Sequence, residues 1–293
     1  RTQGFAGLAN AVLRGIGRDR EAILAASDPL NDDVPQWLAL RWRKTYGEEA
    51  ARAIARALRE EPSLDVTVKS DAEGWAKRLG GVVLPPGSVR LVTHAPVPEL
   101  DGFKDGEWWA QDAAAALPAR LLGARAGERV ADLCAAPGGK TAQLALSGAE
   151  VVALDRSAER LKRLTANLER LKLVAEPSVG DAATYEAPAF DAVLLDAPCS
   201  ATGTIRRHPD VAWTKRAADV ASLAQTQARM LARAARLVKS GGRLVYCVCS
   251  LEPEEGVAQI EALLRRDPDL RRVPIEPGEL GLPPDAITPA GDL

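Results

Sequence analysis

The sequence of 293 residues contains no apolar run long enough to span a bilayer, and no signal peptide is visible. Cysteine is scarce: there are only four, and their spacing matches neither a disulfide framework nor a zinc site. Free thiols in a chain of this length favour a reducing compartment, so we expect a cytoplasmic protein with no metal site and no membrane contact. The net charge is only −2, so any contact with nucleic acid must come from local basic patches.

Methionine is almost absent as well. The only one is Met230, and the chain begins with Arg1. We therefore expect the sequence to be a fragment that lacks its natural N-terminus. Whether it is also shortened after Leu293 stays open. A hydrophobic content of 46% and a charged content of 27% are those of an ordinary soluble protein, and the length allows two domains.

The most informative stretch that is present runs over residues 130–141, V-A-D-L-C-A-A-P-G-G-K-T. Its apolar start is typical of a buried strand in a parallel sheet, and Pro137 ends that strand. Gly138 and Gly139 allow positive φ and leave room for a ligand against the backbone. A helix is expected to start near Lys140, so its free N–H groups favour a carboxylate or phosphate. Such turns also occur without a ligand, but the spacing favours a nucleotide-like cofactor.

A second apolar strand is expected over residues 150–154, and it ends at Asp155. An acid at the end of the second strand is where doubly wound folds bind a ribose diol. The glycine loop has neither the G-x-G-x-x-G pattern nor the Walker spacing. An adenosine cofactor other than a dinucleotide or a nucleoside triphosphate is therefore favoured.

We predict three parts along the chain: a helical segment over 1–60, a small α/β module over 61–110 and a main domain over 111–293. The helices of the first part have basic faces. We give equal weight to two interpretations of these faces, a solvated surface and a contact with the RNA backbone. The basic residues are Arg41, Arg43, Lys44, Arg52, Arg56 and Arg59. Trp108 and Trp109 lie next to the boundary, and we favour core packing over base stacking for this pair.

The main domain alternates strands with helices, which predicts an α/β fold with a parallel sheet and helices on both faces. We expect strands over 190–195 and 244–248, and helices over 157–171, 217–239 and 252–265, with Gly241-Gly242 capping the second helix. Ligands of such sheets bind outside the carboxyl ends of the strands. Those ends carry Cys134 to Lys140, Asp155, Asp181, Asp196 with Cys199, and Cys249.

Several motifs together resemble the Sun/Fmu-type (NusB/Sun) RNA cytosine-C5 methyltransferases, and in particular the bacterial group that acts on 16S ribosomal RNA. The long matches are D-L-C-A-A-P-G-G-K-T (132–141), D-A-P-C-S-A-T-G (196–203) with I-R-R-H-P-D (205–210), and G-G-R-L-V-Y-C-V-C-S (241–250) with P-E-E (253–255). The short matches are N-A-V-L-R (10–14) and Q-D (111–112). The resemblance covers nearly the whole chain. It implies a Rossmann-like, S-adenosylmethionine-dependent enzyme of rRNA methylation and processing, acting as a monomer on RNA.

The resemblance also implies roles for particular residues. The methionine end of the cofactor would lie against Cys134, Ala135, Ala136, Pro137, Gly138, Gly139 and Lys140. Asp155 would bind the ribose, Asp181 the adenine amine, and Asp196 would lie between the cofactor and the target base. Cys249 would be the nucleophile and Cys199 would assist product release. Because Arg206, Arg207 and His208 follow the Cys199 loop directly, we expect them to face the RNA backbone, against the alternative of a solvated loop.

The sequence departs from the family pattern at Val248, where the family has threonine before the nucleophile. Strand alternation would place Cys247 and Cys249 on one face, but Ser250 and the P-E-E motif favour Cys249. Residues 1 to about 20 resemble only the last helix of the family's NusB-like domain, and the small module is interpreted as RNA-binding. Two alternatives stay open: a non-catalytic ribosome-assembly factor that binds the cofactor, and exchanged roles of Cys199 and Cys249.

Overall fold

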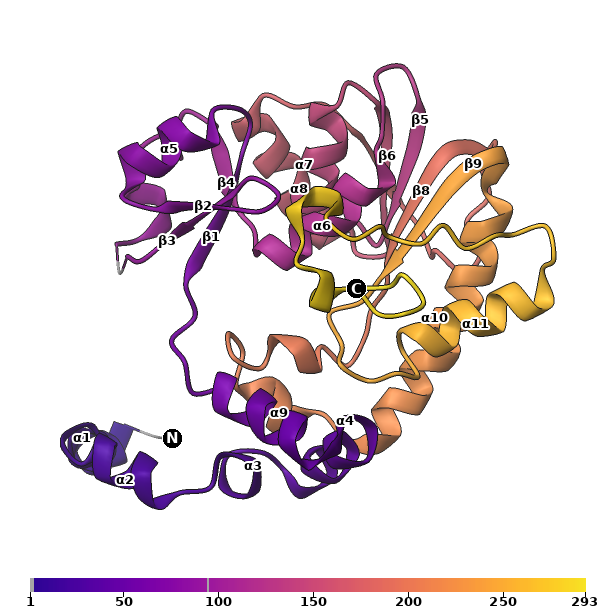
Figure 1. Cartoon of the computed structure of the whole chain (residues 1–293). Helices are drawn as coiled ribbons and strands as arrows, with labels where there is room; N and C mark the ends of the chain where they lie inside the picture. Colours follow the sequence, from indigo (N-terminus) through magenta and orange to yellow (C-terminus); the bar gives the residue numbers. More distant parts are fainter. Residues whose placement is uncertain (1–2, 94) are drawn as a thin grey trace. The chain divides into compact units, whose positions relative to one another are not determined.

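The computed structural model describes residues 3–93 and 95–293, and its contacts divide the chain into two compact units (Figure 1). The helical unit holds the residues up to Glu61 together with Ile205–Ala217. The second unit holds Pro62–Thr204 and Ala218–Leu293, and so contains both sheets. The three-part division predicted from the sequence stays a prediction.

The helices are α1 (Ala6–Arg18), α2 (Arg20–Ala26), α3 (Pro29–Asp32), α4 (Gln36–Ala57), α5 (Ala72–Leu79), α6 (Ala113–Leu122), α7 (Gly139–Leu146), α8 (Ala158–Leu171), α9 (Asp210–Thr214), α10 (Ala217–Arg236) and α11 (Val257–Arg266). The strands are β1 (Leu64–Val68), β2 (Val82–Leu84), β3 (Ser88–Leu91), β4 (Trp108–Ala110), β5 (Arg129–Leu133), β6 (Glu150–Asp155), β7 (Glu176–Val179), β8 (Phe190–Asp196) and β9 (Val238–Cys247). Short 3-10 segments lie at Gln3–Phe5, Val97–Glu99, Thr202–Thr204, Glu279–Gly281 and Pro284–Ala286. Within these described residues no helix is long and apolar enough to cross a membrane.

The larger sheet has the order β7-β6-β5-β8-β9, and every neighbouring pair is parallel. Alternating side chains of its strands enter two different cores. Val130 and Val151 pack with leucines of α6 and α7 on one face, whereas Leu133 and Leu154 pack with α10 on the other. Figure 1 shows helices on both sides of this sheet. The predicted α/β fold with a parallel sheet covered on both faces is confirmed.

The smaller sheet is antiparallel, in the order β2-β3-β1-β4. Trp108 and Trp109 end up in different cores, because successive strand residues point to opposite faces. Trp108 is fully buried in the small module, and Trp109 packs against α8 beside the large sheet. The expected core packing of this pair is confirmed, and it shows how the small sheet joins the large one.

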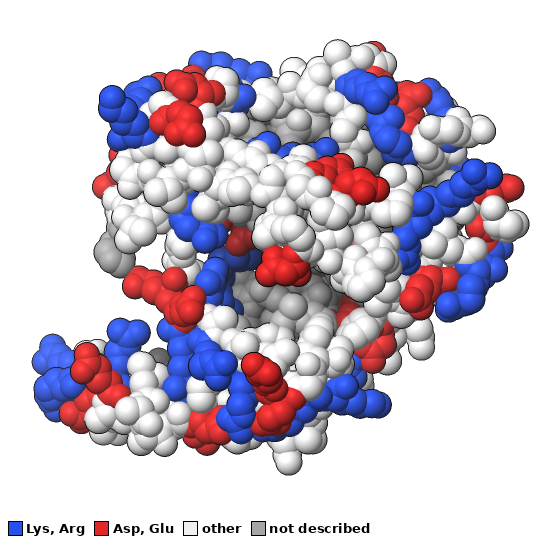
Figure 2. Space-filling model, in the orientation of Figure 1, with Lys and Arg blue, Asp and Glu red and all other residues white. Residues whose placement is uncertain are grey.

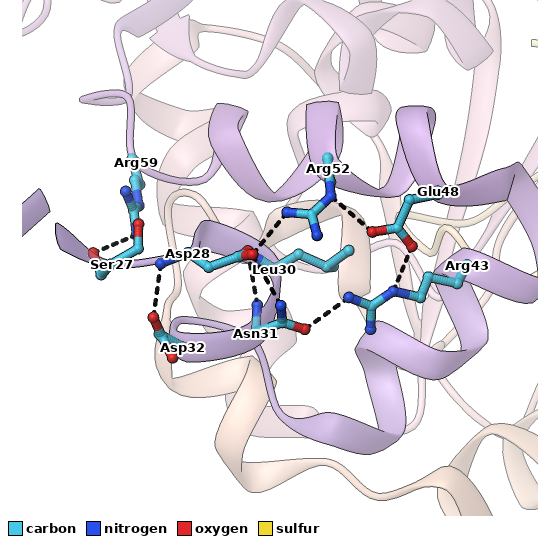
Figure 3. A network of polar contacts seen from close by, with 9 residues as sticks. All are labelled: Ser27, Asp28, Leu30, Asn31, Asp32, Arg43, Glu48, Arg52 and Arg59. Atoms are coloured by element: carbon cyan, nitrogen blue, oxygen red, sulfur yellow. Dashed lines mark hydrogen bonds and ion pairs between the residues drawn. The ribbon is translucent and has the colours of Figure 1, made fainter. Parts of the chain in front are cut away.

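The helical unit is organised by α3 and α4, which pack together around buried Leu30 and Trp42. Figure 3 shows a polar network across these helices. Arg52 bridges Asp28 at 2.8 Å and Glu48 at 2.7 Å, and Arg43 and Arg59 extend the network. These arginines of the predicted basic face therefore join one helix to the next.

Two predicted elements differ from the structure at their ends. The helix expected over 217–239 ends at Arg236, and Gly241-Gly242 does not cap it but lies inside β9. The chain leaves the helix early because residues from Val238 pair with β8, and the glycines fit where a Cβ on Gly242 would come within 2.7 Å of the Asp191 carbonyl oxygen. The last helix begins at Val257 instead of Glu252, since turns containing Pro253 come first.

Candidate active site

The carboxyl ends of the parallel strands bring the predicted functional residues to one edge of the sheet. Asp155 is the last residue of β6 and Asp196 the last residue of β8. Asp196 stands in register with Cys247, the last residue of β9. The central strand β5 leads directly into the glycine loop between them. Strand order therefore places the loop between the two acids.

The glycine loop has the local geometry that its sequence predicts. Gly138 has φ of +102°, and a Cβ there would lie 2.9 Å from Leu164 Cγ, so the position needs glycine. Helix α7 begins at Gly139, one residue before the predicted start. Its first N–H groups have no intrahelical acceptor, which makes this turn suitable for a carboxylate.

Asp155 is buried and holds the glycine loop in place. Its Oδ2 accepts the Ala136 N–H at 3.2 Å, and its Oδ1 accepts the Ser157 N–H at 2.9 Å. Arg160 adds an ion pair at 3.1 Å and also donates to the Ala136 carbonyl oxygen. The carboxylate thus fixes the backbone that would face a cofactor.

Asp181 is exposed and follows β7, where its Oδ1 accepts the Ala183 N–H at 2.8 Å. The preceding Gly180 donates its N–H to the Asp155 carbonyl oxygen at 3.2 Å. This hydrogen bond ties the Asp181 loop to the end of β6. The two predicted cofactor acids therefore lie on neighbouring loops.

Asp196 is half-buried and contacts groups from two neighbouring elements. Its Oδ2 pairs with Lys140 Nζ at 2.8 Å, and the Cys247 thiol donates to its Oδ1 at 3.6 Å. Burial by itself lowers the pKa of Lys140, but the acidic groups around it, chiefly the Asp196 carboxylate, together outweigh burial and raise that pKa. Lys140 therefore stays charged and joins α7 to the end of β8.

The two cysteines of the second and third motifs touch each other. Cys199 Sγ lies 3.4 Å from Cys249 Sγ, with Cys199 half-buried and Cys249 exposed. Cys247 has a different environment, because it packs into the core below α6 while Cys249 lies beyond the end of β9. Because β9 ends at Cys247, strand alternation does not place Cys249, and the predicted shared face of Cys247 and Cys249 stays a prediction.

Their thiols differ in acidity for reasons visible in these contacts. A hydrogen bond from Cys199 lowers the pKa of Cys249, against the opposing effect of partial desolvation by the surrounding protein. The same contact, together with burial, raises the pKa of Cys199. Burial raises the pKa of Cys247 well above its usual value and that of Cys134 to about 12. Of the four thiols, Cys249 is the one whose surroundings favour the nucleophilic thiolate.

Arg206, Arg207 and His208 belong to the segment that packs with the helical unit, whereas Cys199 belongs to the other unit. Arg206 lies 3.7 Å from Glu60, both arginines are half-buried, and His208 is exposed. On the face shown in Figure 2, lysines and arginines are interspersed with acids. The predicted contact of Arg206, Arg207 and His208 with RNA stays a prediction.

Sequence reasoning missed the buried acid Asp132, although it lies in the first motif. Its Oδ2 accepts the Thr141 hydroxyl at 2.6 Å, and burial raises its pKa to about 7. Its Oδ1 is buried with no hydrogen-bond partner in the described chain. The sequence does carry a signal for this Asp132–Thr141 pair. The acid lies inside an apolar strand run, and the threonine follows nine residues later in the next helix.

These residues fit an adenosylated amino acid. The α7 amides suit its carboxylate, and the unpartnered Asp132 Oδ1 beside that turn can accept a further donor. The acids at the ends of β6 and β7 suit hydroxyl and amine groups. Within residues 3–93 and 95–293, no group of three or more side chains could hold a metal ion.

Comparison with known proteins agrees with this geometry. The profile of a family described as 16S rRNA methyltransferase RsmB/F matches residues 119–282, more than half of the chain. The chain belongs to this family. The predicted family, the predicted class of enzyme and its methyl donor S-adenosylmethionine are thereby confirmed.

Individual relatives support the assignment over most of the chain. The Ribosomal RNA small subunit methyltransferase B of Vibrio cholerae is 39% identical over 94% of this chain and 69% of its own length. Its namesake from Klebsiella pneumoniae is 41% identical with the same coverage. The crystal structure of a methyltransferase homologue from Pyrococcus horikoshii is 27% identical, with a TM-score of 0.71 over 85% of this chain and 86% of that one.

Proposed function

We propose that this enzyme methylates C5 of a cytosine in 16S ribosomal RNA through a covalent bond between Cys249 and C6. The observation that carries the proposal is the 3.4 Å contact between Cys199 and Cys249, which favours the Cys249 thiolate. The names of the relatives support 16S ribosomal RNA as the substrate. Both cysteines are in place, which favours this reading over a non-catalytic assembly factor.

The chemistry explains why a thiolate is needed. C5 of cytosine is a poor nucleophile, and addition of the Cys249 thiolate to C6 turns C5 into an enamine carbon. When bound, S-adenosylmethionine supplies the methyl group that C5 attacks. A base then removes the C5 proton, the C5–C6 double bond reforms and the C6–S bond breaks. The target base must be unpaired or extruded to reach this edge of the sheet.

The acids and the glycine loop have separate parts in this proposal. Asp196 would face N3 of the base, where a proton or hydrogen bond assists thiolate addition. Lys140 Nζ pairs with its Oδ2 and the Cys247 thiol donates a hydrogen bond to its Oδ1, so both carboxyl oxygens are held in place. Residues 134–140 would bind the methionine end of the cofactor, Asp155 the ribose and Asp181 the adenine.

Replacing Cys249 tests the proposal most directly. Cys249→Ala should abolish both methyl transfer and the covalent complex. Cys199→Ala should permit attack but stall release, so a denaturant-resistant protein–RNA adduct accumulates. Because Cys199 also lowers the pKa of Cys249, this adduct should form more slowly near neutral pH than at alkaline pH. A denaturing gel of each variant with RNA and cofactor gives the answer, and Ser240→Ala, an exposed position at the opposite end of β9, serves as the control.

The reverse outcome would be equally clear. A stable adduct in Cys249→Ala with none in Cys199→Ala would make Cys199 the nucleophile. Absence of any adduct in all variants, together with normal cofactor binding, would favour the non-catalytic assembly factor.

Arg206, Arg207 and His208 are proposed to contact the RNA backbone. Arg206→Gln combined with Arg207→Gln should weaken RNA binding and reduce its salt dependence by about one to two phosphate contacts. Because Arg206 also pairs with Glu60, Glu60→Gln is the control for loss of that contact alone. An unchanged salt slope in the double variant would favour a solvated loop.

A further inference from the structure

Glu255 is a carboxylate that the structure buries completely beside the two cysteine loops. Its Oε1 accepts the Ser200 N–H at 2.9 Å and a hydrogen bond from Gln227 Nε2 at 3.0 Å. Its Oε2 accepts the Ser250 hydroxyl at 2.5 Å and also the Ser200 hydroxyl. Neutral donors from three separate segments therefore converge on one side chain.

These donors stand next to the reactive sulfur atoms. Ser200 directly follows Cys199, and Ser250 directly follows Cys249. The two serine hydroxyls also lie 3.0 Å from each other. A single carboxylate thus binds the residue adjacent to each cysteine.

Gln227 of α10 fixes the other side of the Cys199 loop. Its buried amide donates to the Pro198 carbonyl oxygen at 2.9 Å as well as to Glu255. Cys199 is therefore flanked by a held carbonyl group before it and a held N–H after it. Further along the Cys199 loop, Gly203 donates its N–H to the Cys249 carbonyl oxygen at 3.0 Å, which joins this loop to the Cys249 loop.

We propose that Glu255 is a positioning residue that holds the Cys199 and Cys249 loops at the separation where their sulfur atoms touch. The importance of this role for catalysis rests on the proposed covalent mechanism. The positioning itself can be measured in the protein without RNA. Its hydrogen bonds go to Ser200, Gln227 and Ser250, so it acts on the two cysteines through the serines that follow them.

The site needs a carboxylate and not merely a polar group of the same size. The Ser200 N–H donates to both oxygens, at 2.9 and 3.2 Å, and Gln227 Nε2 also donates to Oε1. An amide in either orientation would therefore turn its NH₂ group toward a group that can only donate. A buried donor without an acceptor is unfavourable, so the loops would move apart. Because contact with Cys199 lowers the pKa of Cys249, separation of the loops should raise it.

The pH dependence of Cys249 alkylation tests this role. RNA-free protein is treated with iodoacetamide over a range of pH, and the rate at Cys249 is followed by peptide mass spectrometry. Glu255→Gln should slow alkylation severalfold near neutral pH and shift its midpoint upward, while the rates converge at alkaline pH. The matched control is Glu254→Gln, the same change at the neighbouring exposed residue, and it should retain the wild-type profile.

Ser250→Ala provides a second, milder variant if Glu255→Gln does not fold. It removes one donor from the Cys249 loop and leaves the Ser200 contacts in place, so a smaller shift in the same direction is expected. An unchanged alkylation midpoint in a folded Glu255→Gln or Ser250→Ala protein would overturn the proposal. Failure of the covalent mechanism would instead appear as absence of an RNA adduct in the wild-type and Cys199→Ala proteins, with the alkylation shift intact.

Discussion

The helical unit and the strand-end site use carboxylates in opposite ways. In the helical unit Asp28 and Glu48 leave 34% and 53% of their side chains exposed, and arginines pair with them. At the strand ends Asp155, Asp132 and Glu255 are buried, and most of their partners are backbone N–H groups or hydroxyls.

This difference shows what each kind of contact can do. Exposed ion pairs are screened by salt and contribute little stability, so they suit helices that only need to be held together. A buried carboxylate bound by directional neutral donors costs more free energy to misplace, and it therefore fixes loop geometry. The loops that carry the glycines and the two cysteines are held in this second way.

Among the changes that test this contrast, replacing Asp155 should have the largest effect. Asp155→Ala removes the acceptor for two backbone N–H groups and the proposed ribose ligand. Binding of S-adenosylmethionine should weaken by about 1–3 kcal/mol, which is the scale of a buried hydrogen-bonding group left unpaired. Isothermal calorimetry measures the change, with exposed Glu159→Ala on the following helix as control. An unchanged affinity would remove Asp155 from the ribose role.

Asp132 offers a test through pH, with a smaller expected effect. Its pKa is raised by burial to about 7, from about 3.8 in an unfolded chain, so the folded state favours the neutral acid. Its contribution to stability is therefore complete below the unfolded pKa and is lost as the pH rises through about 7. Asp132→Asn cannot ionise and should show a flatter dependence of melting temperature on pH.

Thermal unfolding of wild-type and Asp132→Asn protein at about pH 5 and about pH 8.5 measures this difference. At the higher pH, the melting temperature of the variant should rise relative to that of the wild type. Each 1 kcal/mol of unfolding free energy corresponds to a shift of roughly 2–4 °C. Exposed Asp105→Asn is the control and should shift both measurements equally. Parallel pH profiles for wild type and Asp132→Asn would show that Asp132 is ionised throughout.

Much of the strand-end site could be predicted because its residues are local to strands and motifs. The apolar runs before Asp155 and Asp196 and the glycines after β5 specify both the strand and its end. Parallel pairing then brings those ends together without knowledge of any individual contact. The predicted fold and the positions of the acids follow from this.

The contacts themselves could not be predicted, because they join residues far apart in the sequence. Lys140 and Asp196 are 56 positions apart, and Cys199 and Cys249 are 50 apart. The end of α10 shows the same limit. Helical periodicity favoured continuation to Lys239, but pairing of Val238 with β8 overrides that local preference. The basic helix face likewise gave no sign that Arg52 pairs with Asp28, 24 residues earlier.

The smallest effect is expected in the helical unit, at Asp28. A hydrogen bond from Arg52 lowers the pKa of Asp28 to about 2, and the Leu30 and Asn31 N–H groups assist. Since this pKa lies below that of the unfolded chain, the stability it contributes is present above about pH 4 and is lost as the pH falls toward 2. Asparagine caps a helix as well as aspartate does, so Asp28→Asn removes the charge and keeps the cap of α3.

Asp28→Asn should therefore lower the melting temperature of the helical unit slightly at neutral pH, by less than either change at the strand ends. The difference should fade at 1 M salt, where the Debye length is only about 3 Å. Asp28→Ala also removes the cap and should cost more, with a loss that persists at high salt. Circular dichroism melts at low and high salt separate these cases. A large, salt-insensitive loss in Asp28→Asn would mean that this exposed carboxylate fixes geometry as Asp155 does, and the contrast between the two regions would no longer hold.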